Sequence, residues 1–228
     1  MEEIREIIRR NLEIKHNEHI PPIPEEFKDG KNDAKFCDWI INESMLATLP
    51  LNLKIPHEEM YKEAMAQKHM FVKHRGSSSP GWSSMAIHGT AVHHTSPKEN
   101  YFDKDNMPEY DWTELADLCP ISKQWLQSLG FSKFNRVRFM LLEPGGFILD
   151  HSDYNPKNGP PSPSPILNAF NACITQPEDC ALKNTKSDIC VPFKPFEVYC
   201  YNNNQFHHAY NNSDENRFHL IIHNNEYR

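Results

Sequence analysis

The C-terminal stretch Phe206–Ile222 reads FHHAYNNSDENRFHLII and predicts two neighbouring β-strands joined by a polar turn. Its first six residues are rich in aromatic side chains and its last six end in a β-branched pair, as strands often do. The residues 212–216 between them include Asn, Ser and Asp, whose side chains hydrogen-bond nearby backbone in turns. The first strand carries His207 and the second begins with Arg217. On neighbouring strands, both side chains can point into one cavity. The imidazole of His207 could bind a transition metal there, and the guanidinium of Arg217 could bind a carboxylate with two hydrogen bonds.

A second motif, His151-Ser152-Asp153, supplies the ligands that a metal site at His207 would still need. Residues two apart on an extended strand face the same side, so His151 and Asp153 could bind one metal ion together. His207 would complete a set of two imidazoles and one carboxylate, which is the facial triad of non-haem Fe(II) oxygenases. A His-x-Asp pair alone is a weak signal. A later His and an Arg that begins the next strand make the combination much more specific.

Both motifs resemble those of the aspartyl/asparaginyl β-hydroxylase-like family of 2-oxoglutarate oxygenases. That family typically has a His, an aromatic residue, a turn of the Asn-Asn-Ser-Asp-Glu type and an Arg before an apolar strand, as in HHAYNNSDENRFHLII here. The segments RVRF from Arg136, EPGG from Glu143 and HSD from His151 resemble its first two core strands. The resemblance extends from about residue 82 onward and is strongest from residue 132.

The resemblance implies the cofactors and the residues that bind them. Fe(II) would be bound by His151, Asp153 and His207, and Arg217 would hold the distal carboxylate of 2-oxoglutarate. Many members carry an Arg-x-His pair on the third core strand that helps to hold this cosubstrate. The matching place here is Ala169-Phe170-Asn171, where no Arg is present and Asn171 stands in for the His.

Asp153 also separates this chain from part of the family. Animal members that hydroxylate EGF-like domains lack a carboxylate in the first motif, whereas the branch that includes bacterial proline hydroxylases has one. Like that branch, the chain is expected to hydroxylate an unactivated C–H bond of a small soluble substrate, such as a free amino acid or a derivative, with O2. Arg75, Arg138 and His88 are candidates for holding a substrate carboxylate, although each is more often structural.

From residue 132 onward the pattern predicts strands only, eight in succession. Eight strands with short connections favour a mainly β fold of the double-stranded β-helix type, also called jelly roll or cupin. Residues 132–228 would form this catalytic core, and residues 1–131 a helical and loop region packed on it, within one domain. The predicted strands span residues 136–143, 147–153, 166–175, 180–184, 189–193, 196–202, 206–211 and 217–223. Before the core, helices are predicted at residues 1–15, 34–46, 56–69 and 119–130, and a strand at residues 82–92.

Composition excludes several other classes of protein. The formal net charge of -7 argues against a nucleic-acid partner, and no apolar run approaches membrane-spanning length. The charged N-terminus, MEEIRE, does not resemble a secretory signal, and the six cysteines contain no close Cys-x-x-Cys pair. They are therefore expected to be reduced thiols in a cytoplasmic protein.

Two alternatives remain open at the level of sequence. The first is a hydroxylase of the same kind whose substrate is an Asp, Asn or Pro side chain in a peptide or protein. The second is a cupin-type metalloenzyme or binding protein that does not use 2-oxoglutarate. The Arg217 motif argues against the second alternative.

Overall fold

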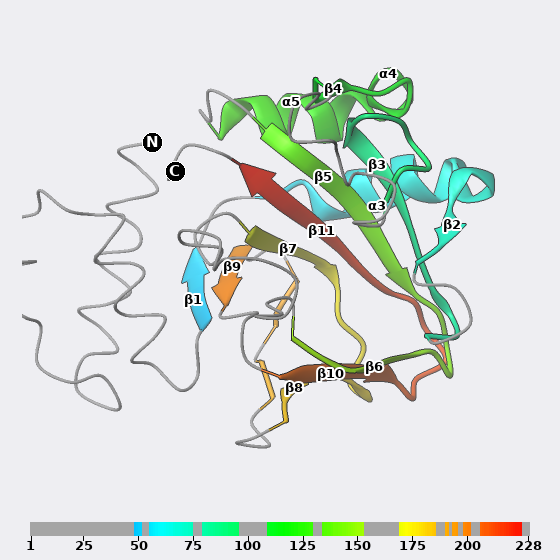
Figure 1. Cartoon of the computed structure of the whole chain (residues 1–228), viewed down its shortest axis with the longest axis vertical. Helices are drawn as coiled ribbons and strands as arrows, with labels where there is room; N and C mark the ends of the chain where they lie inside the picture. Colours follow the sequence, from blue (N-terminus) through cyan, green and yellow to red (C-terminus); the bar gives the residue numbers. More distant parts are fainter. Residues whose placement is uncertain are drawn as a thin grey trace, which may run out of the picture.

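The computed structural model describes residues 48–51, 55–74, 79–95, 109–129, 134–152, 169–185, 190–191, 193–195, 198–201 and 206–224. Within these residues the chain forms two antiparallel sheets that pack against each other (Figure 1). The helices predicted at residues 1–15 and 34–46 lie outside the described residues. So does Asp153, the carboxylate of the predicted metal site.

The major sheet has the strand order β1-β9-β7-β11-β5-β3-β2, and β4 pairs with β3 beside it. The minor sheet has the order β6-β10-β8. The strands of the major sheet are β1 (Thr48–Leu51), β2 (Val72–Lys73), β3 (Trp82–Gly89), β4 (Asp111–Trp112), β5 (Phe134–Leu142), β7 (Ala169–Thr175), β9 (Val198–Tyr201) and β11 (Arg217–Asn224). Those of the minor sheet are β6 (Phe147–His151), β8 (Cys180–Asn184) and β10 (His207–Asn211).

Successive strands from β5 to β11 alternate between the two sheets, which is the winding of a double-stranded β-helix. The predicted fold class is therefore confirmed. One predicted strand, at residues 189–193, is reduced in the described residues to an isolated bridge between Cys190 and Lys183 at the edge of the minor sheet. The strand pairing also crosses residue 131, because β3 pairs along β5. The division of the chain at that residue stays a prediction.

Gly145 and Gly146 form the turn that carries the chain from β5 in the major sheet to β6 in the minor sheet. Gly145 has a φ of 73°, a conformation that side chains with a Cβ rarely adopt. A Cβ on Gly146 would lie 2.7 Å from the carbonyl oxygen of Glu143. The two glycines thus allow a tight turn between the two sheets.

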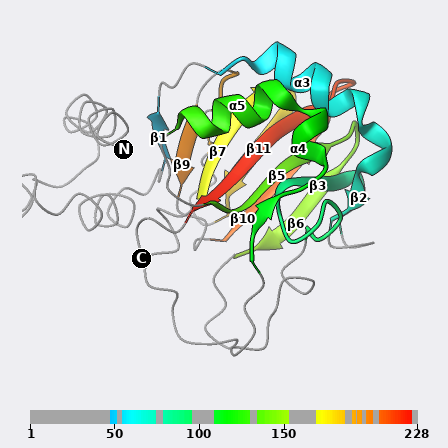
Figure 2. The same ribbon diagram turned by 90° about the horizontal axis from the view of Figure 1, so that it is seen from above.

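Helices cover the outer face of the major sheet (Figure 2). They are α3 (His57–Ala66), the 3-10 turn η2 (Lys68–Met70), α4 (Leu115–Leu118) and α5 (Pro120–Ser128). Proline at the first position of α5 suits a helix start, since that residue has no intrahelical N–H bond to lose. The Glu63 carboxylate of α3 accepts the next two N–H groups, from Ile121 and Ser122, at 2.7 and 2.9 Å. No helix among the described residues is long and apolar enough to cross a membrane.

Alternation along the strands divides the core into two layers. On β5, Phe139 and Leu141 face the helices, whereas Met140 and Leu142 face the minor sheet. The layer between the sheets is completed by Trp82, Ile148, Cys173, Leu182, Phe193 and Ala209. This inner layer also contains buried polar residues, and these form the candidate site.

Candidate active site

His151 of β6 and His207 of β10 are paired directly across the minor sheet. Their ring centroids are 4.4 Å apart, and His207 is buried with 5% exposure. The sequence predicted that these two side chains meet, and the structure brings them together.

A β-bulge in β6 produces this meeting. His207 pairs with His151, but Ala209 pairs with Ile148, so β6 has one residue more than β10 between the two pairs. An extra residue re-aims the side chains on one side of the bulge. Ile148 can therefore face the apolar inner layer while His151, three residues later, faces His207. The bulge is a feature of the strand pairing and has no signal in the sequence.

A backbone carbonyl fixes the ring of His151. Its Nδ1 lies 2.7 Å from the carbonyl oxygen of Leu149, which can only accept a hydrogen bond. Nδ1 therefore carries the proton, and Nε2 keeps the lone pair that binds a metal. Metal-binding histidines usually have such a partner on the other ring nitrogen. The pair His151 and His207 thus fits the imidazole part of a facial triad.

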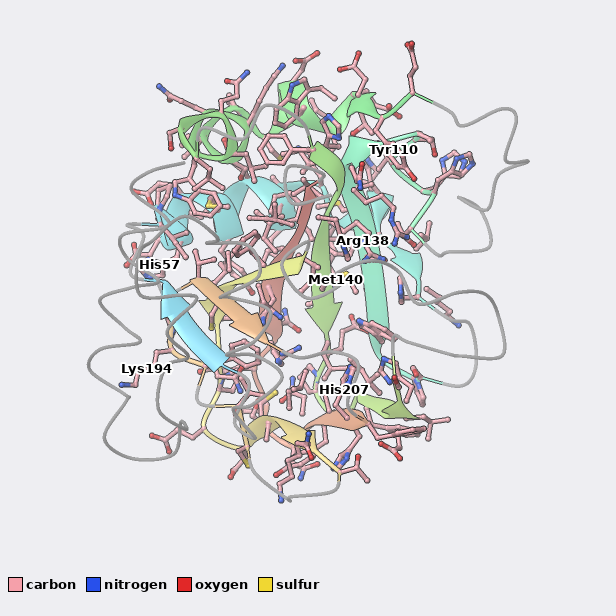
Figure 3. The ribbon with its side chains drawn as sticks, turned by 60° about the vertical axis from the view of Figure 1, so that its left-hand side comes forward. His57, Tyr110, Arg138, Met140, Lys194 and His207 are labelled. Carbon is pink, nitrogen blue, oxygen red and sulfur yellow. The ribbon has the colours of Figure 1, made fainter. Side chains whose placement is uncertain are left out.

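An aromatic wall lies beside the two histidines. The Trp82 ring is 6.4 Å from that of His151, and the His74 ring packs on Trp82 at 4.2 Å. His74 in turn hydrogen-bonds Ser84 Oγ at 2.8 Å. In Figure 3, Met140 and Arg138 lie on β5 above His207, which belongs to the minor sheet. Among the described residues no three His, Cys, Asp or Glu side chains are grouped so as to hold a metal, and the third predicted ligand, Asp153, is not among them.

Arg217 begins β11 and is buried on the inner side of the major sheet. Its Nε donates to Gln176 Oε1 at 3.2 Å, and its Nη2 lies 3.2 Å from His219 Nδ1. The guanidinium carbon lies 5.4 Å from the centre of the Phe193 ring. A cation shielded by an aromatic ring and by the core is well suited to bind a carboxylate away from water.

Asn171 of β7, the second predicted cosubstrate residue, belongs to the same cluster. It is buried, and its Oδ1 lies 2.7 Å from His219 Nδ1. His219 Nε2 lies 3.1 Å from Gln176 Oε1. Asn171, Gln176, Arg217 and His219 therefore form one hydrogen-bonded group, which we call the Arg217 cluster.

Two members of the Arg217 cluster were not predicted. His219 had a signal, because it follows Arg217 by two positions on a predicted strand and so faces the same side. Gln176 had none. It directly follows β7 and reaches Arg217 because Thr175, at the end of β7, pairs with Phe218 near the start of β11.

Burial sets the charge state of the groups around Arg217. It lowers the pKa of His219 well below the usual range, and the positive charge of Arg217 lowers it further. The ring is therefore neutral at pH 7 and has a single N–H to donate. Burial also raises the pKa of the Cys180 thiol, against the opposing effect of Arg217. Arg217 is thus the cation of the cluster.

The side chain of Asn211 binds the turn that follows β10 rather than His207. Its side-chain nitrogen donates to the carbonyl oxygens of Leu142 and Glu215, each at 2.8 Å. Its Oδ1 accepts from the backbone N–H of Ser213 at 3.1 Å. Asn211 therefore closes the predicted turn between β10 and β11 and ties it to β5. This turn determines where Arg217 enters its strand.

The candidates for a substrate carboxylate have different environments. His88 donates from Nδ1 to the carbonyl oxygen of Asn135 at 2.7 Å, and its ring packs edge-on against Trp112. Burial lowers the pKa of His88, so it serves as a neutral structural residue. Arg138 is buried and donates to the carbonyl oxygen of Thr95 at 2.6 Å. Arg75 lies outside the described residues.

Several solved structures are similar to this chain in overall arrangement. The viral collagen prolyl hydroxylase of Paramecium bursaria Chlorella virus-1, solved with 2-oxoglutarate, is 10% identical, with 81% of this chain and 97% of that one covered and a TM-score of 0.45. A prolyl-4-hydroxylase of Pseudomonas putida is 14% identical, with 84% and 98% covered and a TM-score of 0.43. A prolyl hydroxylase of Trichoplax adhaerens, in complex with a hypoxia-inducible-factor peptide, is 10% identical, with 89% and 94% covered and a TM-score of 0.49.

The family is shown by a sequence model. No curated protein matches the chain in sequence. The model of the aspartyl/asparaginyl β-hydroxylase family matches residues 40–225, which include both histidines, Asp153 and the Arg217 cluster. The chain therefore belongs to the aspartyl/asparaginyl β-hydroxylase family of Fe(II)- and 2-oxoglutarate-dependent oxygenases.

Proposed function

We propose that this oxygenase hydroxylates an unactivated C–H bond of a small soluble substrate, a free amino acid or a close derivative. The observation that carries the assignment of the active centre is the direct pairing of His151 with His207 across the minor sheet. Asp153 follows His151 by two residues and supplies the carboxylate of the triad.

Each group of the site has a proposed task. His151, Asp153 and His207 hold Fe(II) on one face. When bound, the metal with 2-oxoglutarate and O2 supplies the oxidising power for hydroxylation. Arg217 holds the distal carboxylate of 2-oxoglutarate, and the inner apolar layer, including Trp82, keeps water from the reacting groups. The protein thus contributes positioning and a dry environment.

A small acidic or zwitterionic substrate is supported by the charge of the inner face. Arg138 extends from β5 on the same side as Met140 and Leu142, which line the space between the sheets. Its Nη2 lies 3.2 Å from His223 Nε2. Burial and the charges of Arg136 and Arg138 hold the pKa of His223 well below its usual range. The positive charge in this region is therefore carried by guanidinium groups, which suit a substrate carboxylate.

Anaerobic titration of the purified protein with Fe(II) and then 2-oxoglutarate tests the active centre. A visible charge-transfer band that requires both additions is expected. Its absence, with Fe(II) bound, would mean that the keto acid does not reach the metal and would reject the oxygenase assignment.

A separate screen tests the substrate. Succinate formation is measured over free amino acids and over peptides that contain Asp, Asn or Pro. Turnover of free amino acids is expected. Turnover confined to peptides would reject the small-substrate proposal and leave the active centre intact.

A further inference from the structure

Gln176 links the guanidinium of Arg217 to the opposite sheet. Its Oε1 accepts from Arg217 Nε at 3.2 Å, and its Nε2 donates to the backbone carbonyl oxygen of Cys180 at 2.5 Å. Cys180 begins β8 in the minor sheet, whereas Arg217 begins β11 in the major sheet. The bond to Cys180 also fixes the orientation of the amide, because a carbonyl oxygen can face only its NH2 end. The oxygen of Gln176 is thereby directed at Arg217.

The same oxygen lies close to a second member of the cluster. His219 Nε2 is 3.1 Å from Gln176 Oε1, and the other ring nitrogen of His219 lies near Arg217 Nη2. Phe193 packs against both, with its ring 4.7 Å from that of His219 and edge-on to it. Arg217 is thus positioned through two different nitrogens and by one ring. A long, flexible side chain held in this way loses less rotamer freedom when it binds a ligand.

We propose that Gln176 is a positioning residue that orients the Arg217 guanidinium for the distal carboxylate of 2-oxoglutarate. The proposal rests on the function proposed above for Arg217. Gln176 occupies the Nε side of the guanidinium, so a carboxylate that binds with two parallel hydrogen bonds must use the Nη1–Nη2 edge. Gln176 thus selects the edge that is presented to the ligand, and it does so without adding charge to the site.

Two variants separate this role from a merely structural one. Gln176→Leu keeps the approximate volume and removes the bond to Arg217, so the Kd and KM for 2-oxoglutarate should rise about 10- to 100-fold, the effect of losing one hydrogen bond to a charged group. At saturating 2-oxoglutarate, kcat should stay within about twofold, because the loss is one of binding. Gln176→Glu places a carboxylate beside Arg217 that competes with the ligand. The Kd of the Gln176→Glu protein for 2-oxoglutarate should rise more than that of the Gln176→Leu protein, and its melting temperature should not fall.

The neighbouring Thr175 provides a matched control. Its Oγ1 donates to the carbonyl oxygen of Asn216 at 2.7 Å and belongs to the same segment. Thr175→Val removes this local hydrogen bond without touching the guanidinium. It should lower the melting temperature and leave the affinity for 2-oxoglutarate unchanged.

The readout is calorimetric titration of 2-oxoglutarate into anaerobic Fe(II)-loaded protein, together with the Kd for Fe(II) and the melting temperature of each variant. The Kd for Fe(II) should stay constant across all variants. A Gln176→Leu protein that binds 2-oxoglutarate as tightly as wild type would overturn the inference. So would equal losses of 2-oxoglutarate affinity in the Gln176→Leu and Thr175→Val proteins. If the wild-type protein itself binds no 2-oxoglutarate, the proposed function of Arg217 fails instead, so the two failures are distinct.

Discussion

His151 and His207 form a directly opposed pair across β6 and β10, and an extra residue in β6 lets the ring of His151 face that of His207. His208, the adjacent residue in the sequence, is on the other side of β10. Its Nδ1 lies 3.3 Å from Thr185 Oγ1, at the exposed edge of β8. Neighbouring residues of a strand point to opposite faces, so only one of the two histidines can serve the site.

The first prediction follows from this opposition. His207→Ala should weaken Fe(II) binding by more than about 10-fold, since even the loss of a residue that only orients a ligand has an effect of that size. His208→Ala should leave Fe(II) binding unchanged. Metal affinity is measured by anaerobic titration of both variants. Equal or reversed losses would contradict the assignment of His207.

The second prediction concerns Arg217. Removing one partner of a buried charge pair costs roughly 3 to 5 kcal/mol, so Arg217→Ala should weaken 2-oxoglutarate binding by at least about 100-fold. Arg217→Lys keeps the charge but loses the two parallel hydrogen bonds, so it should be intermediate. Fe(II) affinity serves as the control and should change little. An Arg217→Ala protein with normal affinity for the keto acid would exclude this role.

Local patterns in the sequence predicted several of the strands that carry the candidate site. The strand predicted at residues 180–184 coincides with β8, and His207 and Arg217 lie on the strands predicted for them. These predictions succeeded because alternation and turn chemistry act over a few residues.

Features that depend on contacts between distant strands could not be predicted. The bulge in β6 exists only relative to its partner β10. Gln176 joins the site because β7 ends near the point where β11 begins. Edge strands such as β1, which includes Pro50, and the two-residue β2 and β4 have too little pattern of their own.

The third prediction concerns the turn between the two sheets. Gly146→Ala should lower the free energy of unfolding by about 1 to 3 kcal/mol. The added Cβ would lie 2.7 Å from the carbonyl oxygen of Glu143 and 2.8 Å from a methyl group of Leu142. Gly145 has open space around a Cβ and needs only a positive φ, which Asn tolerates. Gly145→Asn should therefore lower the free energy of unfolding by less than Gly146→Ala does. Urea unfolding of both variants measures the difference, and a reversed order would contradict this account of the turn.

The fourth prediction concerns thiol reactivity. Burial, with the negative charge of Glu63 nearby, raises the pKa of Cys119 to about 12. Burial also raises the pKa of Cys180. Cys190 is exposed. Since the thiolate is the reactive form, iodoacetamide should label Cys190 in the folded protein well before Cys119 or Cys180. Peptide mapping after timed labelling gives the order. Early labelling of Cys119 would show that the helical layer opens readily.

The last prediction concerns the pH dependence of stability, through His219. Its pKa in the folded protein is far below the value of about 6.5 expected in the unfolded chain. Below pH 6.5 the unfolded chain therefore binds a proton at this position that the folded protein does not, and stability falls as the pH falls. Above pH 6.5 neither the folded nor the unfolded state binds this proton, and the contribution of neutral His219 to stability is fully present. The free energy of unfolding should then change, through this one group, by up to about 1.4 kcal/mol per pH unit once His219 is protonated in the unfolded chain.

His219→Asn removes the titrating ring and keeps a polar side chain beside Arg217. The variant should be less stable than wild type at pH 8, because Asn cannot span the distance between Asn171 and Gln176 that the ring spans. The difference should shrink as the pH is lowered from 7 to 5, because only the wild-type protein bears the cost of keeping His219 neutral. Urea unfolding of both proteins at several pH values measures it. Parallel pH profiles would mean that the folded protein protonates His219 as readily as the unfolded chain does, and Arg217 would then not be the sole cation of its cluster at low pH.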